Sequence, residues 1–361
     1  MRWLKSAALA SLTLATLPLP TIRCSPQNSL FVDQKRYAMG TVFEIVVYDE
    51  DLPRAVAAAR AALDEVVRLD GIMSNYKPES DLSRINQTAH FQPVRIPREL
   101  YELIEESLFY SRHSDGQFDI SVGPLVDLWK AALAGGPLPT APEQAAALRC
   151  VGYQKIELIP PDRIQFHSDC MRLDLGAIGK GYAVDRAAEI LSAGGIHRAY
   201  IDAGGSTIYA LGAPPGGNAW RVRLRDPSRK LGPQVMLMNN SVSTSEQSPP
   251  SSLQGDAPGH IILPGTGRPL QTRYAISVTA PSATASDALS TTLLLLGPAK
   301  GAALVKTLHN VSAIWIDSDG QPTLAGDGVS FFLPGENRPA YVSPLKNRIA
   351  ATSEPAKELL P

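Results

Sequence analysis

Residues 174–185 hold the first side chains whose types and spacing could do chemistry. They read Asp-Leu-Gly-Ala-Ile-Gly-Lys-Gly-Tyr-Ala-Val-Asp, which predicts a strand end, a tight glycine turn and the start of a helix. A helix start leaves about four main-chain N–H groups unpaired and carries partial positive charge, so it favours an anion, above all a phosphate. Lys180 adds a full charge, and Asp174 stands at the mouth of the turn. Because the spacing matches neither the dinucleotide nor the P-loop pattern, an ordinary strand-to-helix turn remains the alternative.

A second candidate site lies in residues 282–297, which predict a buried helix that ends at Gly297 and Pro298. Asp287 and Thr291 are four residues apart, so they share one helix face. A carboxylate and a hydroxyl suit a hard cation such as Mg²⁺, which prefers oxygen ligands and completes its shell with phosphates and water. The alternative is that Asp287 only favours the helix dipole and that Thr291 bonds back to its own helix.

Several short motifs accompany these two segments. They lie at residues 39–41, 73–76, 80–86, 116–125, 202–205, 220–227, 243–245, 260–262 and 286–289. Each motif alone is weak, but the ordered series resembles the ApbE family of FAD:protein FMN transferases from residue 37 to residue 334. The resemblance implies a single two-lobed α+β domain over residues 35–334, related to the T-fold, with a ligand cleft.

The resemblance also implies where FAD binds. The flavin-binding positions of the family fall on Met39, Tyr76, Asp119 and Asp174, and a phosphate-contacting lysine falls on Lys180. An aromatic side chain such as Tyr76 can stack on a flavin or adenine ring. The alternatives are a surface turn residue for Tyr76 and a core side chain for Met39.

Metal and catalytic positions carry over in the same way. The resemblance implies that Mg²⁺ is held by the main-chain carbonyl of Ala177 and by the side chains of Asp287 and Thr291. Together with Lys180, the cation would neutralise a pyrophosphate and the charge that develops on the leaving AMP. His260 falls at the family's active-site histidine and could take the proton of an attacking hydroxyl. The alternative is that His260 is structural.

The implied activity is Mg²⁺-dependent transfer of FMN from FAD, through a phosphoester, to a Ser or Thr hydroxyl of an acceptor redox protein, with release of AMP. Two alternatives stay open, a Mg²⁺-dependent FAD pyrophosphatase that gives FMN and AMP, and a noncatalytic flavin-binding protein. The chain departs from the family pattern at Ser206 for Asp or Asn, Glu246 for Gly, Leu263 for Asp and Gly265 for a basic residue. Of these departures, Glu246 and Leu263 suggest the flavin-binding alternative. Because the metal positions and Lys180 are intact, flavin and metal binding are better supported than efficient transfer.

Residues 1–24 read as a secretory signal segment, with a positive start and an apolar run too short for a typical membrane span. We therefore expect an exported protein that faces the periplasm. Cys24 raises the alternative of a lipid anchor to the inner membrane, although Arg23 stands where a lipidation signal has a small residue. In an oxidising compartment Cys150 and Cys170 could pair, or both could be buried free thiols.

Composition and periodicity indicate the frame that must position these groups. The chain has 361 residues, of which 44% are hydrophobic and 19% charged, so we expect a folded protein with a substantial core. Its net charge of −1 argues against nonspecific nucleic-acid binding. Alternating helix and strand patterns favour a mixed α/β or α+β fold over a doubly wound sheet. We expect helices at 53–69, 97–111 and 178–192, strands at 43–48, 155–159, 163–166, 171–175, 199–202, 207–211, 220–224 and 275–279, a loop over the site at 245–273, and a loose tail at 335–361.

Overall fold

The computed structural model describes residues 21–24, 30–247, 259–329 and 331–333. The expected signal segment lies outside the described residues except for its last four, which form β1 (Thr21–Cys24). The expected tail at 335–361 lies wholly outside them. Cleavage and lipidation near Cys24 therefore stay predictions.

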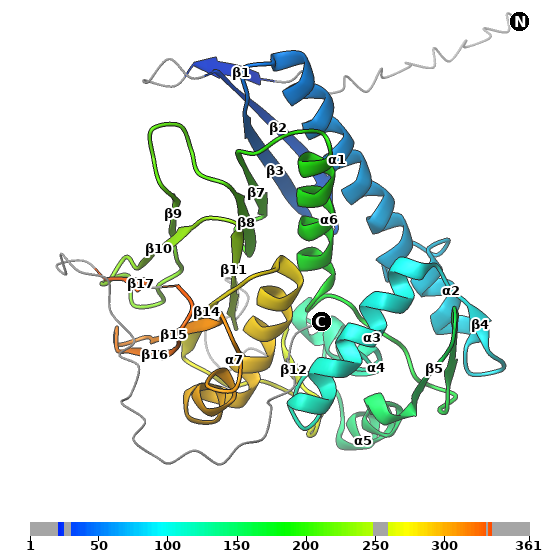
Figure 1. The fold of residues 1–361 in the computed structure, drawn as a ribbon. Coiled ribbons are helices and arrows are strands. Elements are labelled where there is room, and N and C mark those ends of the chain that lie inside the picture. The colour runs from blue at the N-terminus through cyan, green and yellow to red at the C-terminus, as the bar shows by residue number, and fades with distance from the viewer. Residues whose placement is uncertain (1–20, 25–29, 248–258, 330, 334–361) are drawn as a thin grey trace, which may run out of the picture.

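Within the described residues, a nine-stranded sheet forms the centre of the fold (Figure 1). Every neighbouring pair in it is antiparallel, which makes the fold α+β and excludes a doubly wound sheet. In order across the sheet, the strands after β1 are β2 (Leu30–Ala38), β3 (Thr41–Tyr48), β7 (Ala199–Ala203), β8 (Thr207–Leu211), β11 (Asn240–Glu246), β14 (Tyr274–Ala280), β15 (Ser312–Asp317) and β16 (Pro322–Gly326).

Three long helices pack on one face of this sheet: α1 (Leu52–Met73), α6 (Gly179–Ala193) and α7 (Ala283–Val305) (Figure 1). By length and composition alone α7 could cross a membrane, but it packs on α6, β11 and β14 as the central helix of the core. Gly297 has φ 74° and ψ 169°, which interrupts the helix before Pro298. The first helical segment of α7 therefore ends where the sequence predicts, and a second segment follows.

The other face of the sheet is covered by a small antiparallel sheet of β9 (Trp220–Arg223), β10 (Gln234–Leu237) and β17 (Phe331–Phe332). Alternate residues of its strands point toward the large sheet, as the two-residue period of a strand requires. They form a second apolar core, whose buried members include Ile208, Val222, Leu224, Val235, Leu237, Val242 and Phe331.

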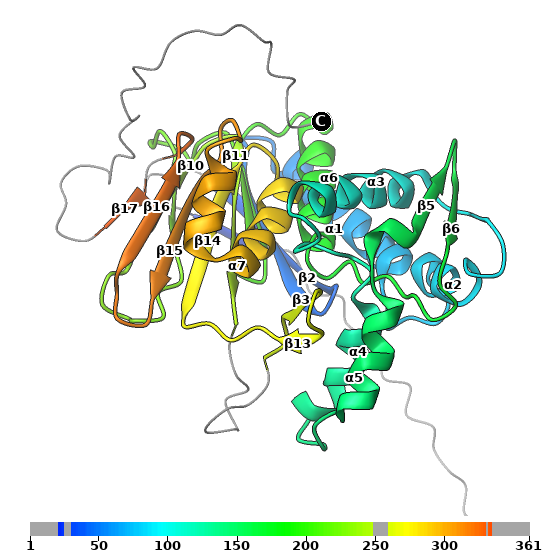
Figure 2. The same ribbon diagram turned by 90° about the horizontal axis from the view of Figure 1, so that it is seen from below.

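A helical lobe lies beside the sheet and its covering helices (Figure 2). It contains α2 (Asp81–Thr88), α3 (Arg98–His113), α4 (Gly123–Leu133), α5 (Ala141–Cys150), a 3-10 turn at Tyr153–Lys155 and a sheet of β4 (Val94–Arg95), β6 (Arg163–Phe166) and β5 (Ile156–Ile159). A disulfide joins Cys150, at the end of α5, to Cys170. The structure thus contains the disulfide alternative and not two free thiols.

Residues 171–175 do not form the expected strand. The side-chain amide of Asn86 accepts from the main-chain N of Leu173 at 2.7 Å and donates to the Leu173 carbonyl at 3.0 Å. The next main-chain N, that of Asp174, donates to the carbonyl of Ile120 at 2.7 Å. An isolated parallel bridge also joins Arg172 to Val122. The buried main-chain groups are thus satisfied by one side chain and by residues 120–122, without a regular strand.

A short hairpin of β12 (Ile262–Leu263) and β13 (Arg268–Pro269) lies in the segment expected as a loop over the site. Figure 2 shows β13 beside α4. Trp129 of α4 donates its Nε1–H to the carbonyl of Gly267 at 2.7 Å, and Ile262 packs in the apolar cluster around Trp129. The hairpin therefore fastens this segment to the helical lobe.

Candidate active site

A cavity of about 570 Å³ opens between the large sheet, α7 and the helical lobe. Every predicted site residue except Met39 lines it, namely Tyr76, Asp119, Asp174, Ala177, Lys180, His260, Asp287 and Thr291. These residues come from turns of the helical lobe, the start of α6, the segment before β12 and the first half of α7. The fold therefore gathers in one place residues that lie far apart in the sequence.

Met39 lies outside this group. It occupies the turn between β2 and β3 with a positive φ of 49°. Its side chain is partly buried and packs against the main core, as the core alternative for this residue expects. The structure does not bring Met39 to the cavity wall, and its contact with flavin stays a prediction.

The start of α6 forms the floor of the cavity. Asp174 Oδ1 accepts from the main-chain N of Gly176 at 2.7 Å, which fixes the turn before the helix. Lys180 Nζ donates to the carbonyl of Gly176 at 3.2 Å, so the ammonium lies over the same turn. No side chain caps α6 at Ile178. The turn thus presents a cation and a helix N-terminus to the cavity, which suits an anionic group.

Asp287 is the most buried carboxylate of the site, with 4% of its surface exposed. Its Oδ2 accepts from the main-chain N of Gly181 at 2.9 Å. Its Oδ1 accepts from Thr207 Oγ1 at 3.1 Å and from Ser243 Oγ at 3.3 Å. A carboxylate has about four acceptor positions, so these three donors leave room for one more ligand on the cavity side.

The predicted metal positions offer oxygen donors of the kind that Mg²⁺ prefers. Ala177, Asp287 and Thr291 all line the cavity, and Thr291 Oγ1 lies 3.4 Å from Ser245 Oγ. Among the described residues there is no group of three or more His, Cys, Asp and Glu that could hold a metal. The predicted set contains only one such side chain, so phosphate oxygens and water would have to complete the shell.

Asp119 has a second task besides facing the cavity. Its Oδ1 accepts from the main-chain N and the hydroxyl of Ser121, at 2.8 and 2.6 Å, and its Oδ2 accepts from the main-chain N of Tyr153 at 2.9 Å. Burial raises the pKa of Asp119 above its ordinary value, although these hydrogen bonds act in the opposite direction. The carboxylate therefore anchors the segment before α4 at the cavity wall.

Tyr76 stands at the mouth of the cavity with 76% of its surface exposed. Lys130 Nζ, from α4, lies 4.5 Å from the centre of its ring. An exposed aromatic ring at a cavity mouth is suited to stack on a flat ligand. The position of Tyr76 in a turn between α1 and α2 also agrees with the surface-turn alternative.

His260 completes the cavity wall opposite Lys180. Its side chain remains exposed, yet the surrounding protein lowers its pKa below the ordinary value of 6.5, first by desolvation and then through the positive charges of Lys180 and Arg225. A histidine with a lowered pKa is neutral at pH 7, which is the form that accepts a proton.

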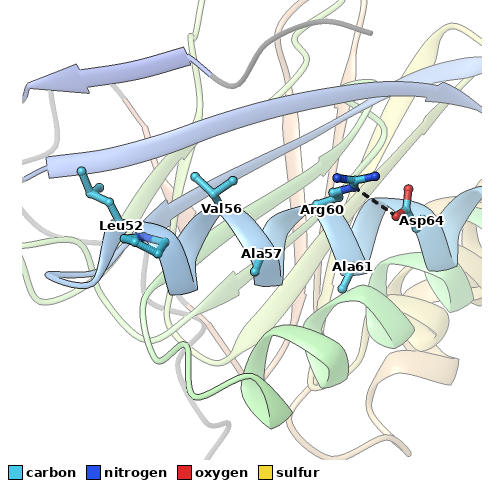
Figure 3. Close-up of a pocket in the computed structure, with 7 residues that line it drawn as sticks. Leu52, Val56, Ala57, Arg60, Ala61 and Asp64 are labelled. Carbon is cyan, nitrogen blue, oxygen red and sulfur yellow. Dashed lines mark ion pairs between the residues drawn. The ribbon is translucent and has the colours of Figure 1, made fainter.

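A second cavity, of about 640 Å³, lies along the outer side of α1 (Figure 3). Its charged side chains are Arg60 and Asp64, which pair with each other at 3.8 Å. The rest of its wall is apolar, from Leu52, Pro53, Val56, Ala57 and Ala61. Its charges are already compensated, so the chemistry points to the cavity at α6 and α7.

The site can now be compared with known proteins. A model of the ApbE family matches residues 39–315. The chain belongs to the ApbE family. Among curated relatives, the FAD:protein FMN transferase of Treponema pallidum (strain Nichols) is 32% identical over 304 residues, which is 78% of this chain and 83% of the relative. A FAD:protein FMN transferase of Klebsiella pneumoniae (strain 342) is 30% identical over 348 residues, which is 93% of this chain and 99% of the relative.

Solved structures of the ApbE family share the fold. The flavin transferase ApbE from Vibrio cholerae matches with a TM-score of 0.73 and 25% identity, over 82% of this chain and 97% of that one. The apo form of the Pseudomonas stutzeri flavinyl transferase ApbE matches with a TM-score of 0.70 and 26% identity, over 86% of this chain and 97% of that one. These matches confirm the α+β architecture that the sequence predicts.

Two departures from the ApbE pattern lie on the cavity wall, and one of them has a partner that the sequence reasoning missed. Ser206 and Glu246 both line the cavity. Glu246 Oε2 lies 3.6 Å from Arg225 Nη1, and Arg225 lines the cavity as well. The extra negative charge of Glu246 is therefore compensated on site. In the sequence, the only sign of this pair is that Arg225 follows β9 closely. The sequence does not show that Glu246 is its partner.

Proposed function

We propose that the chain catalyses Mg²⁺-dependent transfer of FMN from FAD to a Ser or Thr hydroxyl of an acceptor redox protein, through a phosphoester and with release of AMP. The curated relatives compared above are named FAD:protein FMN transferases, so the chain is a flavin transferase of this family in the coarse sense. The observation that carries the finer proposal is the arrangement of Lys180, Asp287 and His260 around one cavity.

The residues of this chain have distinct tasks in the proposed reaction. Lys180 and the start of α6 hold the pyrophosphate of FAD and oppose its negative charge. The acceptor hydroxyl oxygen attacks the phosphorus of the FMN half and passes its proton to the neutral imidazole of His260. The bond between that phosphorus and the bridging oxygen breaks, and AMP leaves with the bridging oxygen.

Magnesium, when bound, would supply further charge neutralisation at the pyrophosphate. The main-chain carbonyl of Ala177 and the side chains of Asp287 and Thr291 would hold it. Support for this assignment comes from their shared place on the cavity wall and from the open acceptor position of Asp287.

The FAD pyrophosphatase alternative uses the same groups, with water in place of the acceptor hydroxyl. The flavin-binder alternative loses some of its motivation, since Arg225 compensates Glu246. One experiment separates all three. Purified protein is incubated with FAD and Mg²⁺, with and without a candidate acceptor, while AMP is followed by chromatography and the acceptor by mass spectrometry. Transfer gives AMP and an acceptor heavier by FMN, the pyrophosphatase gives AMP without acceptor, and the flavin binder gives tight FAD binding without AMP.

We also propose export to the periplasm, and a lipid at Cys24 that attaches the protein to the inner membrane stays the alternative to a protein free in the periplasm. The signal-like start of the chain and the disulfide between Cys150 and Cys170 support an oxidising compartment. Fractionation tests the proposal, because an uncleaved chain in the cytoplasm would contradict export. If the lipid is present, Cys24→Ala releases the protein from membranes, and if it is absent the variant fractionates as the wild type does.

A further inference from the structure

The side-chain amide of Gln247 is fully engaged beside the active-site histidine. Gln247 follows β11 directly, and its side chain is buried. Its Nε2 donates to the main-chain oxygens of Ile261 and Leu270, each at 3.0 Å. Its Oε1 accepts from the main-chain N of Ile261 at 3.0 Å. One side chain thus bonds both main-chain groups of the residue after His260, as a neighbouring strand would.

The same amide also packs against the residue before His260. Gly259 is buried, and a Cβ placed on it would overlap Cγ, Cδ and Nε2 of Gln247. Gly259 is not among the residues with positive φ, so close approach is the reason for a glycine here. His260 is therefore held between two residues that both contact Gln247.

The side chain of His260 makes no hydrogen bond to any residue in the described part of the chain, and only desolvation and two cations, Lys180 and Arg225, act on its charge. In many enzymes a catalytic base is oriented by a third group that is hydrogen-bonded to it. Here the main chain on either side of His260 must supply that orientation.

We propose that Gln247 is a positioning residue that fixes the peptide around His260 and thereby directs the imidazole into the cavity. The proposal rests on the proposed function for the role of His260 as proton acceptor. Gln247 itself is not among the residues that line the cavity. Its effect is therefore expected on turnover and not on the binding of FAD.

The pattern of three bonds explains why a glutamine suits this position. The two carbonyls need donors and the Ile261 N–H needs an acceptor, and a primary amide supplies both. A carboxylate at 247 would face two carbonyl oxygens without a proton to donate. A methionine would keep the length and volume but make none of the three bonds, so Gln247→Met isolates the hydrogen bonds from packing.

The first test compares Gln247→Met with Gln34→Met. Gln34 also donates its amide to a main-chain carbonyl, that of Val56, but it lies in β2 and its bond reaches α1. We expect Gln247→Met to lower kcat by about tenfold to hundredfold, the loss typical of a catalytic group displaced by about 1 Å. The KM for FAD, and FAD binding followed by flavin fluorescence, should stay within about twofold. Gln34→Met should leave all three quantities unchanged.

Two further measurements do not depend on turnover. Hydrogen exchange at the Ile261 amide should speed up in Gln247→Met, because that amide loses its acceptor. The chain has six histidines, so the His260 imidazole can be assigned by NMR with a His260→Gln variant, and its resonance should shift and broaden in Gln247→Met. If the wild type proves inactive, the proposed function fails, but these two measurements still decide the role of Gln247.

A double-mutant cycle of Gly259 and Gln247 provides a further test, and its first variant leaves Gln247 unchanged. Gly259→Ala should displace the amide of Gln247 and reproduce the loss of kcat. In the background of Gln247→Ala the clashing atoms are gone, so Gly259→Ala should then cost little more. Additive losses, or unchanged Ile261 exchange and an unchanged His260 resonance in Gln247→Met, would overturn the proposal.

Discussion

The main-chain N of Gly181 donates to Oδ2 of Asp287 at 2.9 Å and joins the first turn of α6 to the N-terminal part of α7. A Cβ on Gly181 would overlap the carbonyl of Ala283 and come within 2.7 Å of the Asp287 Cβ. The turn at the start of α6 and the predicted metal position on α7 are therefore in direct contact, and only a residue without a side chain fits between them.

Gly181→Ala should destabilise the protein by about 1–3 kcal/mol, the usual cost of forcing extra volume into a packed contact. Because the two helices must move apart, the FAD affinity should fall as well. Gly71→Ala, on the exposed side of α1 with no atom near the added Cβ, is the matched control and should stabilise by about 0.5–1 kcal/mol. Thermal and urea unfolding measure both changes, and equal stabilities of the two variants would contradict this account.

Asp287→Asn should abolish the response of FAD turnover to Mg²⁺ while leaving the fold nearly unchanged. The asparagine keeps an acceptor for Gly181, and the hydroxyls of Thr207 and Ser243 can accept from its NH₂ group instead of donating. Asp287→Ala is the poorer test, because it leaves the N–H of Gly181 and the hydroxyls of Thr207 and Ser243 without their acceptor. This loss should lower the free energy of unfolding by about 1–3 kcal/mol. Asp317→Asn is the control, since Asp317 also accepts from main-chain N–H groups but lies at the end of β15. A normal Mg²⁺ titration of Asp287→Asn would refute the metal assignment.

The acid limb of the kcat/KM–pH profile, which reports the free enzyme, should have an apparent pKa below the ordinary 6.5 of a histidine. In the proposed reaction the neutral imidazole of His260 accepts the proton, and desolvation with the cations of Lys180 and Arg225 lowers its pKa, so activity should persist to a lower pH than for an ordinary histidine. Arg225→Gln removes one cation and frees the carboxylate of Glu246, and both changes favour the protonated ring. The acid limb should therefore move to higher pH in this variant. A shift to lower pH, or a limb that survives in His260→Ala, would show that another group titrates.

Tyr76→Leu should weaken FAD binding by about fivefold, which corresponds to about 1 kcal/mol of lost aromatic stacking. Tyr76→Phe keeps the ring and should bind FAD as the wild type does. Quenching of flavin fluorescence measures both affinities. If the leucine variant binds FAD normally, Tyr76 is only a surface turn residue.

The sequence predicts best those parts of the fold and of the site that are formed by residues close together in the chain. The turn at Lys180 and the helix that carries Asp287 and Thr291 follow local rules of capping and periodicity, and the structure contains both. The end of the first segment of α7 at Gly297 follows the same rules.

Contacts between segments that are distant in the chain could not be predicted from the sequence. Residues 171–175 have the composition of a strand, but their partners are the side chain of Asn86 and the main chain of residues 120–122, which no periodicity reveals. The pairing of Glu246 with Arg225 and the bonds of Gln247 to Ile261 likewise depend on how distant segments meet. Such contacts decide how the site works, and they require the three-dimensional structure.

The hairpin of β12 and β13 has a consequence for the robustness of catalysis. Trp129 ties it to α4 through Gly267, and Gln247 ties its base to the end of β11. His260, the proposed proton acceptor, therefore lies in a segment that is attached both to α4 and to the end of β11, and loosening either attachment should lower the activity. We expect activity to disappear at lower urea concentrations than the circular dichroism of the sheet. The fluorescence of Trp129 should change together with the activity and ahead of global unfolding.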